Sequence, residues 1–485
     1  MKQLCLSGLL SIFIFLQVGC GGQDTMSEPE VCSPATEENN LTETASVLNP
    51  SSLNREVTRF LVKTRSATAL VKTLQSSGRT VRKFRVRGFE VRTSDLLSDG
   101  WQVIEVASET HREALLEELL KNSDVESVEA DIMVKAAPVK EEALGETARG
   151  FTAAAGWAHK KVHSLQAWTV SRGSEQVVVA IADGGVDRNH RDLEGNLWRN
   201  NGEVLNGRDD DNNGYPDDVY GWDFVRGDND PRPDVKSHKH GSHVAGIVGA
   251  VAKNGARIIG HAPRVRLMPL KFIDSDGQGR VSDAIRAIDY AIRNGAQIIN
   301  MSFSTPVYSK ALYDAVVRAR RAGILVVAAS GNDGVNADSK PFYPAAFGLD
   351  NVISVAASDS RDRLASFSNY GRKSVDVTAP GVSIVSTAPG GTYANLSGTS
   401  MAAPLVTGIA VLVKARHPGF AYKALASSLL LGVEKYSELT SKVRSGGRID
   451  AYKAILASDE VNSGKVIHTD LLTSSVCPAA EVTAN

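Results

Sequence analysis

Three short motifs carry residues that could do chemistry. Asp183 ends the apolar run 176–183, His240 opens HGSHVAG, and Ser400 lies within SGTSMAAP (397–404). A carboxylate, an imidazole and a hydroxyl are the parts of a nucleophilic triad, because a serine attacks only when a base takes its proton and a third group holds that base. Taken singly, Ser400 could be a helix cap and His240 a polar residue at a helix start.

A fourth side chain could stabilise developing charge. Asn332 follows the apolar run 324–329, and one amide donor to an oxyanion is worth about 2.7–4 kcal/mol in the transition state. Alone it would be an ordinary turn residue. The chain order Asp, His, Ser argues against an α/β-hydrolase, which runs Ser, Asp, His around a G-x-S-x-G turn, whereas Ala402 stands at the second glycine position here.

The elements that must position these groups begin at residue 157. Short β-branched runs alternate there with helical patterns, which predicts an α/β fold with a doubly wound parallel sheet covered on both faces. In such sheets reactive groups collect where strands end and helices begin. The four candidate residues follow that rule. The predicted strands are 176–183, 266–273, 296–303, 324–330 and 352–358.

Four sequence blocks resemble the signature blocks of the subtilisin-like serine proteases. They are DGGVD (183–187), HGSHVAG (240–246), AASGN (328–332) and GTSMAAP (398–404), and the resemblance covers about residues 157–457. It implies a subtilisin-like fold and an endopeptidase that acts on proteins or peptides through an acyl-enzyme. The roles it implies are orientation by Asp183, general base catalysis by His240, nucleophilic attack by Ser400 and oxyanion binding by Asn332.

The sequence departs from the family pattern at three places. Gly184 stands where the family usually has Ser or Thr, which removes one possible hydrogen bond near Asp183. Ser-Phe-Ser replaces the usual Ser-Leu-Gly of the substrate-binding strand, and a serine replaces an alanine on the opposite wall. Because strand pairing uses backbone groups, substrate binding should survive, while the preferred P1 side chain stays open. The substrate-binding residues implied are Ser302, Phe303, Ser304, Ala329 and Ser330.

A smaller domain precedes the large one. Residues 55–135 follow the order β-α-β-β-α-β, with one long strand expected over 79–92, which predicts a small ferredoxin-like α+β plait. This domain resembles the family's propeptide, a folding aid and intramolecular inhibitor. The Ala- and Gly-rich stretch 136–156 should then be a linker that contains a self-processing site.

An acidic loop lies between the aspartate and histidine motifs. RDDDNNGYPDD (208–218) places oxygen side chains at alternate positions around Gly214, as the early ligands of a calcium loop do. A full EF-hand is excluded because Tyr220 occupies its twelfth position. The expected ligands of a structural calcium are Asp209, Asp211, Asn213 and Asp217. The alternative is a solvated loop rich in Asx turns.

The chain termini predict export. Residues 1–20 read as a signal peptide of the bacterial lipoprotein type, in which Cys20 is lipidated; a plain secretory signal is the alternative. Residues 21–54 form an acidic tether and 458–485 a polar tail. The protein would be a cell-envelope lipoprotein, at the outer membrane or surface, or be secreted after processing. Cys32 and Cys477 could pair in an oxidising compartment.

Composition bounds the partners. The 485 residues carry a net charge of −1, which argues against nucleic acid and against membrane contact other than the lipid. We expect a monomer. Two alternatives remain for the function: a non-catalytic surface protein on a protease scaffold, and a narrow protease that matures one partner.

Overall fold

The computed structural model describes residues 58–65, 82–86, 89–106, 109–136, 139–143, 156–235, 238–251 and 258–465. All of them fall within one compact unit, residues 45–485. The signal peptide, the tether and the three cysteines of interest, Cys20, Cys32 and Cys477, lie outside the described residues.

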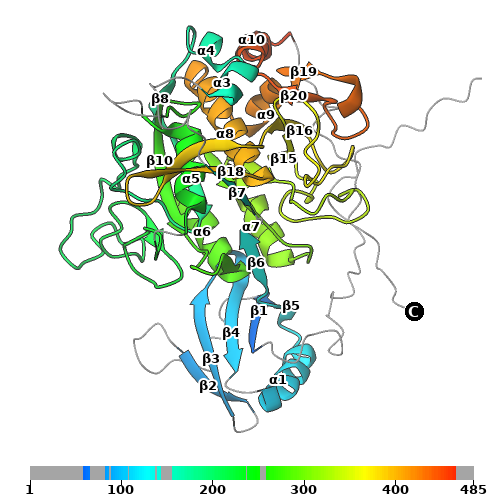
Figure 1. Cartoon of the computed structure of the whole chain (residues 1–485). Helices are drawn as coiled ribbons and strands as arrows, with labels where there is room; N and C mark the ends of the chain where they lie inside the picture. The colour runs from blue at the N-terminus through cyan, green and yellow to red at the C-terminus, as the bar shows by residue number, and fades with distance from the viewer. Residues whose placement is uncertain are drawn as a thin grey trace, which may run out of the picture. The chain divides into compact units, whose positions relative to one another are not determined.

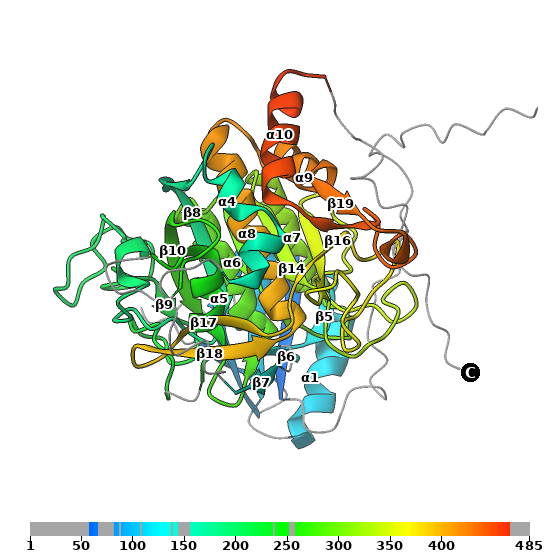
Figure 2. The ribbon, with the colours of Figure 1, turned by 45° about the horizontal axis from the view of Figure 1, so that its top comes forward.

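A nine-stranded sheet forms the large domain (Figures 1 and 2). Its order is β19-β20-β16-β15-β14-β12-β8-β10-β9. Neighbouring strands run parallel except β19 and β20, which are antiparallel. The parallel α/β prediction is confirmed. The strands are β8 (Gly173–Asp183), β9 (Trp222–Asp223), β10 (Arg264–Lys271), β12 (Ile298–Met301), β14 (Leu325–Ala329), β15 (Val352–Ser358), β16 (Val377–Pro380), β19 (Val433–Lys435) and β20 (Gly447–Ile449).

Helices cover both faces of this sheet because its strands are apolar on both sides. In β8, Val179 and Ile181 pack with one group of helices, while Ala180 and Ala182 face the other, as the two-residue period of a strand requires. The first group is α3 (Trp157–Lys161), α4 (Ser164–Ala167), α5 (His240–Gly249), α8 (Thr399–Arg416), α9 (Tyr422–Leu431) and α10 (Ala451–Asn462); the second is α6 (Val281–Arg293) and α7 (Lys310–Arg321). Among the described helices, none combines the length and apolarity needed to cross a membrane.

The small domain is an antiparallel sheet with one described helix against it. The sheet order β2-β3-β4-β1-β5 places the first strand between the fourth and the fifth, as in a ferredoxin-like plait. The single strand expected over 79–92 is instead a hairpin of two strands, and the first expected helix, at 67–76, lies outside the described residues. The elements are β1 (Arg59–Thr64), β2 (Arg82–Val86), β3 (Phe89–Leu96), β4 (Trp101–Val106), α1 (Glu109–Lys121) and β5 (Val125–Ala130).

The first part of the expected linker, together with the residues just before it, forms strands that pair with the large domain. β6 (Met133–Ala136) pairs with β11 (Gln278–Arg280) and β13 (Phe303–Ser304), and β7 (Lys140–Glu142) pairs with β18. The partner β18 (Thr392–Ser397) forms a hairpin with β17 (Ile384–Ala388). At the other end, α10 runs to Asn462, so the tail expected from 458 begins later than predicted.

Candidate active site

The carboxylate and the imidazole of the predicted triad are in contact. Asp183 is the last residue of β8 and His240 the first of α5, with 1% and 6% of their surfaces exposed. His240 Nδ1 lies 2.8 Å from Asp183 Oδ1 and 3.0 Å from Oδ2. The carboxylate therefore holds the ring proton on Nδ1. Within the described part of the chain His240 Nε2 has no hydrogen-bond partner, so it can accept a proton.

Ser400 lies at the same edge of the sheet. It is the second residue of α8 and is fully buried. Its Oγ donates to the backbone carbonyl of Ser302 at 3.1 Å. Ser302 follows β12, whose last residue is in register with Ala182, so the hydroxyl is held next to the strand end that carries Asp183. The structure thus forms the carboxylate–imidazole pair, and the serine hydroxyl rests on the neighbouring strand.

Ser302 and Ser400 are bound to each other in both directions. Ser302 Oγ donates to the carbonyl of Ser400 at 3.2 Å. That carbonyl would normally accept from the residue four positions on in the helix, but this residue is Pro404, which has no N–H. Asn300 Nδ2 in turn donates to Ser302 Oγ at 2.9 Å. The backbone of Ser400 is therefore tied to the chain between β12 and β13.

The amide of Asn332 is oriented by the residue before the nucleophile. Its Oδ1 accepts from the backbone N–H of Thr399 at 2.9 Å and from the Thr399 hydroxyl at 2.8 Å. With Oδ1 engaged, Nδ2 is directed to the other side, 3.2 Å from where a Cβ on Gly398 would lie. An N–H donor therefore stands beside the start of the helix that carries Ser400, where an oxyanion would need it.

Two of the predicted substrate-binding residues, Phe303 and Ser304, pair with a strand of the chain itself. In β13, Phe303 is in register with Ala136 and Ser304 with Lys135. The Phe303 ring packs edge-on against Phe272 at 4.8 Å. On the opposite wall, Ala329 and Ser330 are buried, and Ser330 Oγ donates to the backbone of Asn369 at 3.1 Å. Backbone pairing at β13 survives the departure from the family pattern.

The same segment continues past the nucleophile. Ser397, three residues before Ser400, is in register with Lys140 of β7. Between the two paired strands, Val139 Cγ1 lies 3.2 Å from where a Cβ on Gly398 would be. The chain from 133 to 142 is therefore strand-paired before and after the site, with Val139 close to the Asn332 amide.

With this geometry described, comparison with known proteins identifies the family. Residues 174–441 match the subtilase family. The chain belongs to the subtilase family. It is 40% identical over 289 residues to the thermophilic serine proteinase of Bacillus sp. (strain AK1), a match that covers 60% of this chain and 64% of that protein. It is 38% identical over 299 residues to thermitase of Thermoactinomyces vulgaris, with 61% and 94% covered.

A third relative shows how far the match extends. Subtilisin-like protease 1 of Plasmodium berghei (strain Anka) is 36% identical over 315 residues, which cover 61% of this chain and 52% of that protein. The chain thus spans between half and just under two thirds of two of these relatives and almost all of the third. The shared part contains all four candidate catalytic residues of this subtilase.

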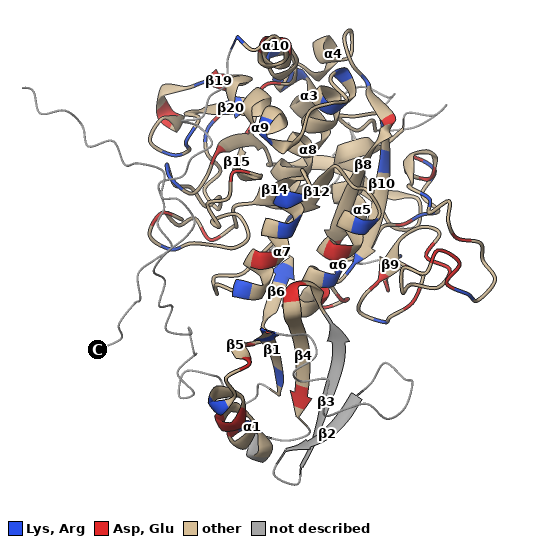
Figure 3. Cartoon of the chain, turned by 180° about the vertical axis from the view of Figure 1, so that it is seen from behind, with Lys and Arg blue, Asp and Glu red and all other residues tan. Residues whose placement is uncertain are grey.

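The acidic loop of this subtilase could hold a metal ion, and two of the four expected ligands, Asp209 and Asp211, lie in a carboxylate cluster with Glu203. One carboxylate oxygen from each of Glu203, Asp209 and Asp211 lies within 4.8 Å of the others, and acidic residues crowd the loops near β9 (Figure 3). The Asp217 carboxylate accepts instead from the backbone of residues 206 and 207, and the Asn213 amide donates to Asp211 and Asp218. The sequence spacing missed Glu203 because it lies before the motif.

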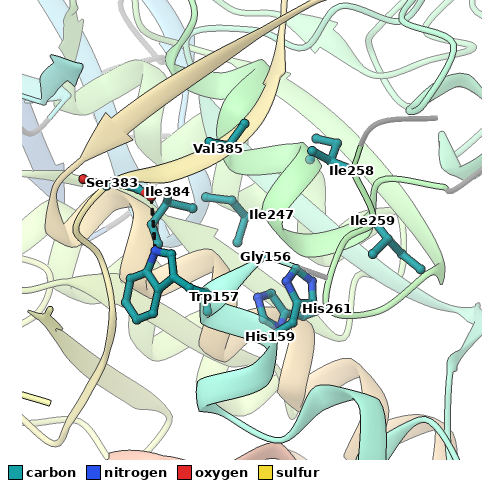
Figure 4. Close-up of a pocket in the computed structure, with 12 residues that line it drawn as sticks. Gly156, Trp157, His159, Ile247, Ile258, Ile259, His261, Ser383, Ile384 and Val385 are labelled. Atoms are coloured by element: carbon teal, nitrogen blue, oxygen red, sulfur yellow. Dashed lines mark hydrogen bonds between the residues drawn. The ribbon is translucent and has the colours of Figure 1, made fainter. Parts of the chain in front are cut away.

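An apolar pocket in the described residues contains none of the catalytic side chains. It lies between α3, α5 and β17, and two imidazoles stack on its wall, those of His159 and His261, with ring centroids 3.9 Å apart (Figure 4). The Trp157 indole donates to the Ser383 carbonyl at 3.3 Å. Burial lowers the pKa of His159 to about 4 and also lowers the pKa of His261. These rings are neutral near pH 7, and Nδ1 of His261 shares a hydrogen bond of 2.8 Å with the Ser164 hydroxyl.

Carboxylates of the small domain reach two helices of the catalytic domain. Glu129 accepts from Ser309 Oγ at 2.5 Å and from the backbone N–H of Lys310 at 2.8 Å, at the start of α7. Asp131 accepts from the backbone N–H and the hydroxyl of Ser282, at the start of α6, at 2.9 and 2.8 Å. Both satisfy backbone donors that a helix leaves free at its N-terminus.

Proposed function

We propose that this subtilase is an exported serine endopeptidase made as a self-processing zymogen. The observation that carries the proposal is the Asp183–His240 hydrogen bond, with Nε2 unpartnered among the described residues at the sheet edge where Ser400 lies. This arrangement supports a base that a carboxylate orients and that lies at the same sheet edge as a hydroxyl.

The first half of the reaction begins when the Ser400 hydroxyl turns from the Ser302 carbonyl towards His240 Nε2. Oγ attacks the substrate carbonyl carbon while its proton passes to Nε2, and Asp183 stabilises the imidazolium. The negative charge moves to the carbonyl oxygen, where Asn332 Nδ2 and the backbone at the start of α8 donate to it.

The second half releases the products. The tetrahedral intermediate collapses, the C–N bond breaks, and the amine leaves with the proton from Nε2, so that Ser400 carries the acyl group. Water then repeats the sequence: it gives its proton to Nε2, attacks the acyl carbon and releases the carboxylic acid. Ser400 regains its proton, and no external reductant, oxidant or cofactor enters the balance.

The nucleophile is tested by intact mass and by a fluorophosphonate probe on wild type, Ser400→Ala and Ser458→Ala. Ser458 is a matched control, because it is also a buried helical serine that donates to a backbone carbonyl, in α10. Wild type and Ser458→Ala should react and shorten, and Ser400→Ala should do neither. Labelling of Ser400→Ala would overturn the assignment. Digestion of denatured casein by the processed enzyme separates a general protease from one limited to a single partner.

Self-processing should cut a bond between Ala136 and Val139. β6 ends at Ala136 on the β13 side of the site, and Val139 lies beside Gly398 on the other side. The released N-terminal part would include the small domain, which would remain as an inhibitor through Glu129 and Asp131. Mass spectrometry of the wild-type products reads the cut directly. A first cut outside residues 136–139 would contradict this placement.

Structural calcium is the metal that fits the acidic loop best. The cluster of Glu203, Asp209 and Asp211 offers only oxygen ligands, which suit calcium. Bound calcium would stabilise the loop and take no part in the chemistry. Adding EGTA should lower the Tm of the full chain by about 3–4 °C, as loss of a ligand held near a hundred times its Kd would, and Glu203→Gln should remove this response. An unchanged Tm for wild type would exclude a bound structural ion.

Export and lipidation rest on the N-terminal sequence. Labelling of the chain with radioactive palmitate in a bacterial host should depend on Cys20 and vanish in Cys20→Ala. Because the cut would lie after residue 136, processing would separate the protease from this lipid. A Cys32–Cys477 bridge would keep the two parts together, and release of the protease by reductant alone is the sign of it.

A further inference from the structure

Gly184, the residue after the catalytic aspartate, leaves the space beside its Cα to a neighbouring histidine ring. A Cβ on Gly184 would lie 2.2 Å from Cε1, 2.7 Å from Nε2 and 3.0 Å from Nδ1 of His238. The backbone does not require glycine here, because the left-handed conformation belongs to the next residue, Gly185, with φ of 98°. Gly184 therefore serves to make room for the imidazole.

The ring of His238 stands among the charged groups of the site. Asp183 and His240 face it from β8 and α5, Asp234 from the preceding loop and Lys271 from β10. Lys271 is fully buried and in register with Asp183. Within the described part of the chain, the Nδ1 atom of His238 is buried and has no hydrogen-bond partner.

We infer that His238 is a positioning residue for the Asp183–His240 pair, packed in the space that a side chain after the aspartate would otherwise fill. The ring covers the Gly184 side of the carboxylate, and Gly184 N–H donates to Asp183 Oδ1 at 2.7 Å on that side. A residue with a Cβ at 184 and the imidazole at 238 therefore exclude each other. The inference rests on the proposed function, since it assigns His238 a role through the triad.

Titration of His238 should be visible in the activity. Burial lowers its pKa, and His240 and Lys271 act in the same direction, against Asp183 and Asp234. The ring is therefore neutral when His240 is the active base. As pH falls, protonation of His238 adds a second step that is coupled to protonation of the base beside it. Below both pKa values kcat/KM should fall a hundredfold per pH unit, compared with tenfold without His238.

The test is a double-mutant cycle on the full-length chain, allowed to process itself, with a peptide anilide as substrate. Gly184→Ser alone should lower kcat/KM by about 100-fold, because the new Cβ displaces the ring, and His238→Ala by about 5-fold. The double variant should lie within about 5-fold of wild type instead of about 500-fold below it. On the acid side of the pH profile, kcat/KM should fall only tenfold per pH unit in His238→Ala and in the double variant. His417→Asn, at a distant histidine paired with Asp459, should change neither readout.

Each outcome decides the matter. If Gly184→Ser fails to fold but the double variant folds and is active, its Tm and its activity together support the claim that a side chain at 184 and the ring of His238 compete for the same space. Three results would overturn the inference while wild type still reacts with the fluorophosphonate. They are additive losses of kcat/KM in the double variant, a double variant that also fails to fold, and an unchanged acid limb of the pH profile in His238→Ala. A wild-type chain that neither reacts nor cuts would remove the proposed function itself.

Discussion

Two regions of the molecule place a carboxylate at the start of a helix, and they differ in what the carboxylate binds. At the sheet edge, Asp183 receives the ring N–H of His240 from within the same domain. At the other region, Glu129 and Asp131 of the small domain receive the first donors of α7 and α6. The first contact orients a base, whereas the second holds two domains together. Substitutions should therefore separate reactivity from latency.

The largest effect should come from Asp183→Asn. An amide in place of the carboxylate favours the wrong tautomer of His240, and kcat should fall about 10⁴-fold with KM little changed. A peptide anilide assay measures both. Asp187→Asn is the control, because the hydrogen bonds described for the Asp187 carboxylate come from loop backbone at residues 189 and 390. A comparable loss of kcat in Asp187→Asn would contradict the role proposed for Asp183.

The next effect belongs to Asn332. Its replacement by alanine removes one oxyanion donor and should lower kcat about 10²–10³-fold. Thr399→Val should cost less, because it removes only one of the two hydrogen bonds that orient the amide. If Thr399→Val were the more damaging change, the oxyanion role of Asn332 would have to be given up.

In the second region, pH should control latency. Burial raises the pKa of Glu129 from 4.5 to about 7, although Ser309 and two backbone donors act against it. Between pH 4.5 and about 7 the docked small domain therefore binds more protons than the released one. The affinity of docking should fall on the order of a hundredfold as pH rises through this range. The lag before activity appears in the processed full chain should shorten from pH 5 to pH 7. In Glu129→Gln this dependence should disappear, while kcat after release is unchanged.

The smallest effect is expected at an exposed contact of the same region. Arg318 bonds to Asp99 of the small domain at 3.0 Å, and 40% of the Asp99 side chain is exposed. Solvent screens such pairs to below about 1 kcal/mol. Asp99→Asn should leave the lag unchanged within about threefold. A change as large as that of Glu129→Gln would mean that exposed charge, and not helix capping, holds the small domain.

The catalytic edge was predictable because local signals and topology agree there. Apolar strands ending in Asp183 and near Asn332, and helices starting at His240 and Thr399, meet at one edge of any parallel sheet. The sequence could not indicate that the Ser400 hydroxyl rests on Ser302, because a rotamer is set by the neighbours that a fold supplies.

The segment from 133 to 142 was not predictable from its own composition. It has no periodic apolar pattern, and its strands exist because β11, β13 and β18 present unpaired edges. The hairpin of β2 and β3 was predicted as one strand, although the alternation of apolar and charged residues shifts phase by one residue between Val86 and Phe89. The place of Glu203 in the carboxylate cluster was not predictable, because a residue outside the motif leaves no spacing signal.

The exchange of hydrogen bonds between Ser302 and Ser400 has a consequence for protein engineering. Pro404 deprives the Ser400 carbonyl of its helical donor, and the Ser302 hydroxyl supplies the replacement. Ser302→Ala alone would leave the buried Ser400 carbonyl without this hydrogen-bond donor, which costs about 1–3 kcal/mol. Pro404→Ala alone would offer the same carbonyl a second donor. Libraries that vary substrate preference near β13 should therefore diversify 302 and 404 as a single coupled module, and leave both fixed when only the neighbouring pocket residues are randomised.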